Sequence, residues 1–316
     1  MVKTFRLQLI RAIVIMLAVL MVASCGTTST SALTQSKGNY ITAVAAEDTW
    51  GSLLSQLGGR YLHVLSVITD PNADPHAYEV SNSVARAFSS ASIVVINGAG
   101  YDDWAAKVLG ATPSKTRQEL NVAAVLKQGV GANPHFWYGP TYVRRIVAVM
   151  EGDLIKAMPT HRAYFEANFR LVSKRLDVLY QSLANLSRRY HSMAVASTED
   201  IFVYFARASG LNLISPLSFM AAIANGNDPP ISSVVTFEEQ LRSHSARLLI
   251  YNTQTITPLT SSIRAMAIRK GIGVVGISEI IEPVGATFEA WMGSQIDRIS
   301  SALGRSITTK NQGQKG

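Results

Sequence analysis

A long segment without proline or glycine separates two halves of this sequence that share one pattern. From Thr160 to Tyr190 apolar residues recur near the helical period of about 3.6 residues. This predicts one helix of about 30 residues, or about 45 Å, although the mean helix of globular proteins has about 11–12 residues. On both sides, short apolar segments alternate with amphipathic ones, a pattern typical of parallel sheets covered on both faces. The sequence therefore predicts an α/β protein whose two lobes are joined by one long rigid helix.

The expected elements follow this alternation. In the first lobe we expect strands at 40–45, 62–68, 92–97 and 122–126, and helices at 49–57, 84–91, 102–109 and 141–158. In the second lobe we expect strands at 193–197, 211–214, 247–251 and 273–277, and helices at 201–209, 237–243, 259–270 and 287–303. The chain then divides into a signal peptide (1–24), a flexible lipidated tether (25–39), an N-terminal α/β lobe (40–158), the connecting long helix (159–190), a C-terminal α/β lobe (191–305) and a disordered tail (306–316).

The first residues carry the features of a secretory signal peptide. Lys3, Arg6 and Arg11 are followed by the apolar segment 12–23 and then by small residues. That segment is shorter than the 20 or so residues that a membrane-spanning helix needs. Cys25 is the only cysteine, and the residues before it resemble a bacterial lipobox, which predicts lipidation of Cys25 and an anchor on the outer face of the cell membrane. The alternatives are an ordinary signal peptide with an incidental free cysteine, or a membrane-anchored helix.

The net charge does not favour nucleic-acid binding. The formal charge of +8 comes mostly from basic residues of the predicted signal peptide and tail. The remaining body is nearly neutral, whereas proteins that bind nucleic acids carry a strong basic excess.

Two histidines stand directly after prolines in polar breaks between apolar segments. His76 lies in the segment Asp74 to Glu79, and His135 in the segment Asn133 to Trp137. Proline fixes its own φ and biases the preceding residue toward an extended conformation, so each histidine leaves a rigid turn in a defined direction. Both turns follow predicted strands, where ligands of open α/β sheets bind, and neutral imidazole is the commonest metal ligand. The alternative is that each is an ordinary surface histidine.

Oxygen donors follow two strands of the second lobe. Glu199 and Asp200 come after the first of these strands, where a carboxylate can face the same crevice. Alternatively Thr198 and the two acids simply start the next helix. Asn252 and Gln254 follow a later strand and are uncharged. Two histidines with oxygen donors suit Zn²⁺, and Mn²⁺ less exclusively.

With these elements in place, the chain resembles the metal-binding solute-binding proteins of bacterial ABC importers for zinc and manganese, the ZnuA-like cluster A-I family. No single motif is very specific, but five occur in order around the long helix. The matching elements are Asp74–Glu79, Asn133–Trp137, Glu199–Phe202, Asn227–Pro229 and Tyr251–Thr255.

The resemblance implies a site between the lobes. In that family two lobes clasp one bare divalent cation, and the long helix limits their relative movement. His76, His135 and Glu199 fall on ligand positions. Many relatives carry a fourth, aspartate ligand near the strand end at Tyr251, where this chain offers Gln254, Asn252 or a bound water instead.

Two further departures concern the choice of metal. Asn133 replaces a common aspartate, which removes a charge close to the metal. The loop rich in histidine and acids that some zinc-specific relatives carry is absent between Leu109 and Asn133. The sequence therefore favours zinc over manganese without deciding between them.

The sequence thus predicts a monomeric lipoprotein without enzymatic activity, which captures a zinc or manganese ion and hands it to a membrane permease. Metal binding should weaken as the histidines protonate below about pH 6.5. The rival hypotheses are a zinc hydrolase, which would need only three protein ligands, and an adhesin at the cell surface. Against the hydrolase, the chain has no His-Glu-x-x-His element.

Overall fold

The structure, a computed structural model, describes residues 40–73 and 78–313. The predicted signal peptide, the tether and Cys25 lie outside these residues, as does His76. Among the helices of the described part, none combines the length and the apolar character that a membrane crossing requires.

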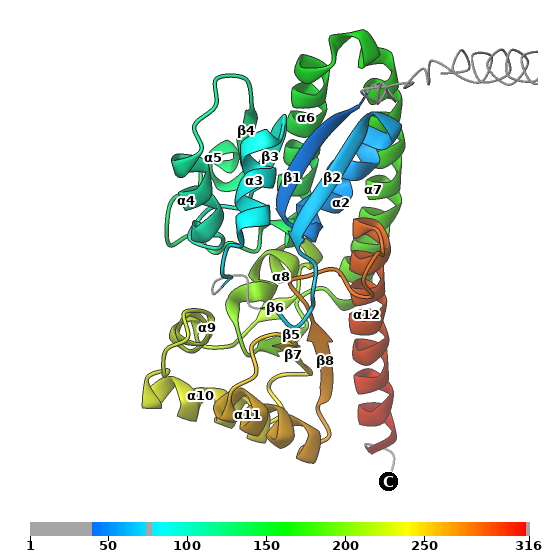
Figure 1. The fold of residues 1–316 in the computed structure, drawn as a ribbon. Helices are drawn as coiled ribbons and strands as arrows, with labels where there is room; N and C mark the ends of the chain where they lie inside the picture. Colours follow the sequence, from blue (N-terminus) through cyan, green and yellow to red (C-terminus); the bar gives the residue numbers. More distant parts are fainter. Residues whose placement is uncertain (1–39, 74–77, 314–316) are drawn as a thin grey trace, which may run out of the picture. The chain divides into compact units, whose positions relative to one another are not determined.

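The first lobe is built on a four-stranded parallel sheet (Figure 1). Its order is β2-β1-β3-β4, and Ala43 of β1 lies opposite Val64 of β2. The strands are β1 (Ile41–Glu47), β2 (Leu62–Ile68), β3 (Ile93–Ile96) and β4 (Gln118–Asn121). The helices are α2 (Asp48–Gly58), α3 (Asn82–Ser90), α4 (Asp103–Ala111), α5 (Val122–Leu126) and α6 (Pro140–Ala157).

The apolar residues of β1 explain why helices cover both faces of this sheet. Successive side chains of a strand point to opposite faces. Ala43 and Ala45 accordingly join one buried cluster, with Trp50 of α2, whereas Val44 joins another, with Phe88 of α3. The expectation of a sheet buried on both faces is confirmed.

One predicted strand of the first lobe is wrong. Residues 122–126 form the helix α5, and the fourth strand is the preceding segment Gln118–Asn121. The Asn121 side chain caps this helix by accepting a hydrogen bond from the N–H of Ala124, and Lys127 ends it in the left-handed conformation.

The long helix is α7 (Arg162–Tyr190), with 29 residues, as the sequence predicts. A short 3-10 turn, Pro159–His161, precedes it. Its buried side includes Leu176 and Leu183, and it packs against α2 and α6 of the first lobe and against α8 and α12 of the second. The helix therefore lies beside both lobes (Figure 1).

The second lobe repeats the strand order of the first. Its parallel sheet has the order β6-β5-β7-β8. The strands are β5 (Ala194–Ser197), β6 (Asn212–Leu213), β7 (Leu248–Asn252) and β8 (Gly273–Ile277). The helices are α8 (Val203–Ser209), α9 (Leu217–Ala224), α10 (Ile231–Arg242), α11 (Pro258–Arg269) and α12 (Phe288–Gly313).

Three helices of this lobe differ from expectation. Helix α9 was not predicted, because only eight residues separate Pro216 from Asn225. Helix α10 begins at Ile231 rather than 237, in a segment where β-branched residues weaken the helix signal. Helix α12 continues to Gly313, past the point where the sequence predicts a disordered tail.

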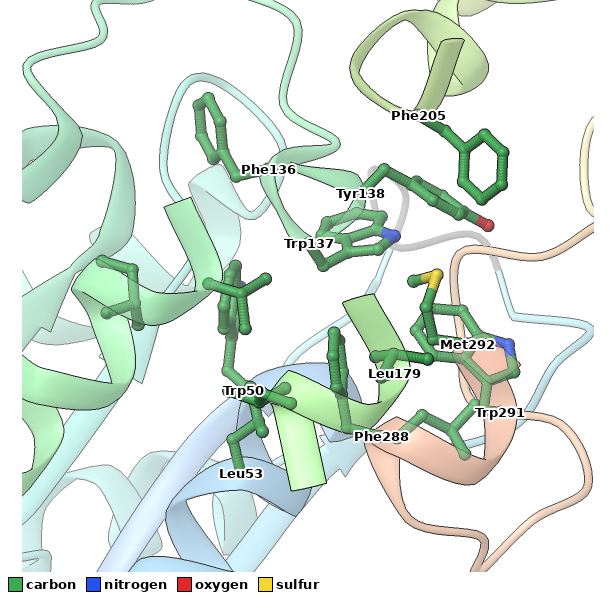
Figure 2. Packing of buried hydrophobic residues seen from close by; sticks show 14 of the residues in the cluster. Trp50, Leu53, Phe136, Trp137, Tyr138, Leu179, Phe205, Phe288, Trp291 and Met292 are labelled. Atoms are coloured by element: carbon green, nitrogen blue, oxygen red, sulfur yellow. The ribbon is translucent and has the colours of Figure 1, made fainter. Parts of the chain in front are cut away.

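The lobes share one apolar core. Trp50 of the first lobe, Leu179 of α7 and Trp291 of the second lobe belong to the same buried cluster (Figure 2). The ring of Tyr138, in the first lobe, contacts the rings of Phe205 and Trp291 in the second lobe. Such large aromatic side chains dominate core energetics, so this cluster fixes the lobes against each other.

Candidate metal centre

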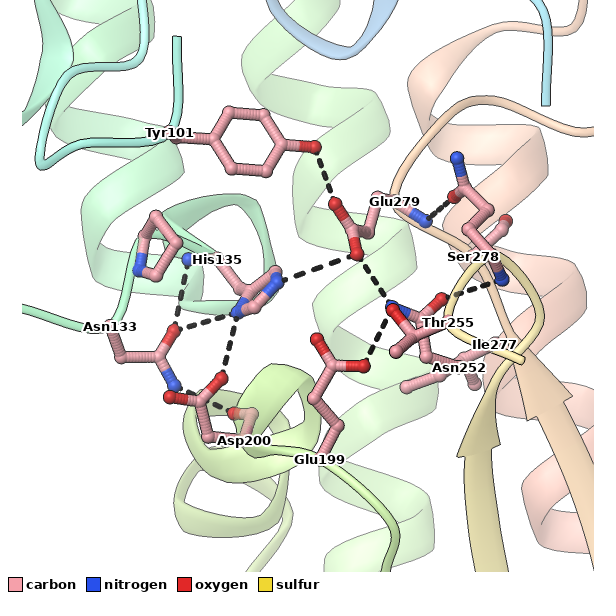
Figure 3. A network of polar contacts seen from close by, with 12 residues as sticks. Tyr101, Asn133, His135, Glu199, Asp200, Asn252, Thr255, Ile277, Ser278 and Glu279 are labelled. Carbon is pink, nitrogen blue, oxygen red and sulfur yellow. Dashed lines mark hydrogen bonds and ion pairs between the residues drawn. The ribbon is translucent and has the colours of Figure 1, made fainter. Parts of the chain in front are cut away.

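Polar side chains converge where the second sheet ends, opposite a loop of the first lobe (Figure 3). Parallel strands bring their carboxyl ends to one edge of a sheet. Glu199 lies two residues after β5, Glu279 two residues after β8, and Asn252 ends the strand β7 between them. His135 faces this edge from the loop that precedes α6.

The His135 ring is held in one orientation. The side-chain amide of Asn133 donates through Nδ2 to the backbone carbonyl of Asp200. This bond leaves Oδ1 of Asn133 as the atom that faces His135. This oxygen accepts the backbone N–H of His135 and lies 2.9 Å from Nδ1 of the ring. Because an amide oxygen only accepts, Nδ1 carries a proton. The other nitrogen, Nε2, faces Oε1 of Glu279 at 3.8 Å and is available to a metal.

The loop before His135 is itself anchored in the first lobe. Buried Asn97 donates from Nδ2 to the carbonyl of Pro134, at 3.0 Å. The Oδ1 of Asn97 accepts from the indole N–H of Trp50, at 3.0 Å. These hydrogen bonds hold the backbone before His135 against the core of the first lobe.

Asn252 links the two acids of the second sheet. Its Nδ2 donates to Glu199 Oε2 at 2.9 Å and to Glu279 Oε1 at 2.5 Å. The other oxygen of Glu279, Oε2, accepts the hydroxyl proton of Tyr101 from the first lobe at 2.7 Å. Buried carboxylates need such donors, because burial without hydrogen bonds is costly.

Burial and mutual charge perturb the ionisation of this site. Burial lowers the pKa of His135, but contacts with Asp200 and Glu279 outweigh it and raise the pKa to about 10. Burial and the charge of Glu279 raise the pKa of Glu199 to about 7. Burial also raises the pKa of Glu279, but contact with His135 outweighs burial and brings it below its ordinary value. The site thus holds an imidazolium among carboxylates, and a divalent cation can replace its proton.

Ligand atoms of His135, Glu199 and Asp200 lie within 4.8 Å of one another. A cavity of about 710 Å³ opens onto His135, Glu199, Asp200 and Glu279. The rest of its lining is mostly small or apolar and includes Val130, Gly131, Ala132, Ala221, Ile223 and Gly226. A small cation can therefore reach the buried donors from solvent.

The four predicted metal ligands do not all lie together in the structure. The structure brings His135 and Glu199 together, whereas His76 lies outside the described residues. Gln254 is beside the site, but its Oε1 accepts the backbone N–H groups of Glu279 and Ile280, at 2.6 and 3.2 Å. Its role as a metal ligand stays a prediction.

Glu279 was missed from the sequence alone, and Asp200 was placed at the crevice without a contact to His135. Glu279 follows β8 as Glu199 follows β5, so the rule of strand carboxyl ends, applied to the last strand, would have found it. Asp200 Oδ1 lies 3.4 Å from Nδ1 of His135. The second lobe therefore supplies a negative charge next to the histidine, where Asn133 supplies none.

Comparison with known proteins gives consistent results. The family model ZnuA, described as the periplasmic component A of a zinc-uptake complex, matches residues 43–302. The chain is 24% identical over 313 residues, 92% of this chain and 95% of the relative, to a protein of Treponema pallidum described as metal-binding. It is 24% identical over 235 residues, 72% of this chain and 76% of the relative, to the manganese-binding lipoprotein MntA of Halalkalibacterium halodurans.

Among solved structures, the periplasmic zinc-binding protein TroA from Treponema pallidum has a similar fold. The TM-score is 0.72 at 15% sequence identity, over 84% of this chain and 99% of that chain. The two parallel-sheet lobes and the long helix are thus a known architecture.

Proposed function

The chain belongs to the ZnuA family of periplasmic zinc-uptake components, and we propose that it captures one divalent transition-metal ion, zinc in preference to manganese, and delivers it to the permease of an ABC importer. The observation that carries this proposal is the convergence of a buried imidazole and two buried carboxylates on the wall of one cavity. Such donors are suited to zinc.

The proposed ligands are His76, His135 and Glu199, with a fourth oxygen donor. The sequence predicts Gln254 for this place, but the geometry favours Glu279. The Gln254 oxygen is occupied by two backbone N–H groups, whereas Oε1 of Glu279 faces Nε2 of His135. A carboxylate also adds the negative charge that a divalent cation needs when it is buried.

Zinc is proposed over manganese for two reasons. Nitrogen and oxygen donors in small number favour zinc, which also lies above manganese in the affinity order of divalent ions. The matching family is described by zinc uptake. The relative MntA is described as manganese-binding, so manganese is the competing cargo.

The proposed cellular setting follows from the N-terminal sequence. Lipidation of Cys25 would hold a monomer at the outer face of the membrane, close to a permease. Metabolic labelling with a fatty acid, compared between the full chain and Cys25→Ala, would test the anchor.

Metal titration of the chain without residues 1–24 tests the central proposal. We expect one site that binds zinc more tightly than manganese, with strong loss of affinity in His135→Ala. His63→Ala is the matched control, because His63 lies in β2 and packs edge to face against Tyr40. Absence of single-site binding of both ions, or equal effects of the two substitutions, would refute the proposal.

A further inference from the structure

One carboxylate of the site is positioned by the opposite lobe. Glu279 follows a strand of the second lobe, yet the Tyr101 hydroxyl of the first lobe donates to its Oε2 at 2.7 Å. The Thr49 hydroxyl, also of the first lobe, donates to its backbone carbonyl at 3.1 Å. Tyr101 is buried, and its ring packs edge-on against His135 and Trp137. The position of this hydroxyl is therefore fixed by the core.

The two oxygens of Glu279 are held differently. Asn252 Nδ2 contacts Oε1, but the same amide also has Glu199 Oε2 and Thr255 Oγ1 as acceptors. An amide nitrogen carries two protons, so Asn252 can give up Oε1 and still donate both. Oε1 is also the atom that faces Nε2 of His135. A cation therefore takes Oε1, while Oε2 stays with Tyr101.

The two oxygens of Glu199 are also held differently. Its Oε2 accepts from Asn252, so one oxygen of this carboxylate is also held by a neutral donor. Each acid is thereby left with one oxygen for the cation.

We propose that Tyr101 is a positioning residue for metal selection, because it restricts Glu279 to one oxygen contact with the cation and so favours a four-coordinate ion over one that needs more oxygen ligands. The inference rests on the proposed function. Zinc is commonly bound tetrahedrally by four ligands, whereas manganese suits octahedral oxygen-rich sites. A carboxylate that binds through both oxygens would raise the coordination number.

Tyr101→Phe removes the hydroxyl and retains the ring that packs on His135 and Trp137. We expect zinc affinity to fall about 10-fold, the lower end of the effect of residues that orient metal ligands, and manganese affinity to stay equal or rise. Tyr190→Phe is the matched control, since buried Tyr190 donates to the carbonyl of Ser300 far from the site. Competition with a chromophoric chelator measures both ions.

A spectroscopic readout separates positioning from folding. Cobalt(II) has intense visible bands when four-coordinate and weak ones when six-coordinate. We expect intense bands in the unaltered chain and weaker bands in Tyr101→Phe. Weak bands in the unaltered chain would overturn the inference whether or not the variant folds.

The two proposals fail in different ways. An unchanged zinc-to-manganese ratio in Tyr101→Phe, or an equal loss of both ions, would overturn this inference and leave the proposed function intact. If the unaltered chain binds neither ion at a single site, the proposed function fails and this inference fails with it.

Discussion

The two lobes have the same strand order, but the segments that follow their fourth strands behave differently. After β4 the chain stays in the first lobe, where α5 and a loop lead to His135. After β8 the chain crosses to the first lobe, and Ile280 joins the buried cluster of Phe88 and Trp104. Identical topology therefore does not give equivalent sites. The crossing makes Glu279 a ligand candidate that follows the second sheet in sequence and contacts both lobes.

The lobes also differ in how they place buried acids. In the second lobe Glu199 and Glu279 border the cavity and have hydrogen-bond donors. In the first lobe Glu47 is buried away from the cavity, and its side chain pairs with a second acid, Asp102. Of these three buried acids, Glu199 and Glu279 are arranged to meet a cation and Glu47 is not.

The largest effect is expected from Ile280→Ala, because Ile280 is buried in the first lobe where the chain crosses over after β8. Truncation of a fully buried isoleucine should lower the free energy of unfolding by about 2–5 kcal/mol and also weaken zinc binding, because Glu279 is its neighbour. Ile263→Ala, a similar truncation in the core of the second lobe, should destabilise without loss of zinc affinity. Denaturant unfolding and zinc titration measure the two effects. Equal zinc affinity in both variants would show that the crossing does not position Glu279.

Glu279→Gln tests which residue completes the site. It retains the shape of the side chain but loses the charge, so zinc affinity should fall by at least about 100-fold, the upper end of the effect of residues that only orient ligands. Glu289→Gln, on α12, is the control and should bind zinc normally. Zinc affinity that survives Glu279→Gln would return the fourth ligand to Gln254.

The pH dependence of zinc binding tests the charge arrangement around His135. Because contacts with Asp200 and Glu279 raise the pKa of His135 to about 10 in the metal-free protein, zinc must displace a proton at neutral pH. Affinity should therefore rise about tenfold per pH unit between about pH 7 and 9, as expected for one released proton. Calorimetry in buffers of different ionisation enthalpy would count this proton. A flat profile above pH 7 would contradict it, and would instead fit the ordinary histidine pKa assumed from the sequence.

Glu47→Gln tests the buried acid of the first lobe, which does not line the cavity. Burial, and then the charge of Asp102, raise the pKa of Glu47 well above its ordinary value of 4.5. The folded protein therefore retains this proton when the unfolded chain has lost it, and stability declines as the pH rises above about 4.5. Glutamine should abolish that decline, so its stabilising effect should be largest at high pH and shrink toward pH 4. Unfolding curves at several pH values, with the exposed Glu239→Gln as control, would reveal a pH-independent gain if this explanation were wrong.

The sequence predicted those parts of the fold that depend on local pattern. Strand Gly273–Ile277 and helix α7 have strong periodic signals. Residues 122–126 are continuously apolar, and such a short run fits a strand or a buried helix equally well. The cap residue Asn121 was the only local sign of the helix.

The rule that ligands bind at the carboxyl ends of parallel strands predicts only part of the site. Glu199 follows from that rule, and Glu279 would have followed had it been applied to β8. His135 was recognised by its proline turn, because the strand predicted before it is the helix α5. The contacts between Tyr101 and Glu279 and between Asn133 and Asp200 join residues far apart in sequence. No local pattern encodes such pairs, because they depend on how the two lobes are docked.

The apolar core that joins the lobes limits how an ion can leave. Wide separation would uncover the sides on which Tyr138 of the first lobe meets Phe205 and Trp291 of the second, all of which are buried. Aromatic side chains bury about 150–250 Å² each, and burial contributes about 25 cal/mol per Å², so uncovering about half of each of these three rings would cost roughly 7 kcal/mol. A fully parted state would then be rare. Exchange of cargo on a useful timescale therefore requires small rearrangements at the cavity mouth, or a partner whose binding energy offsets the exposure.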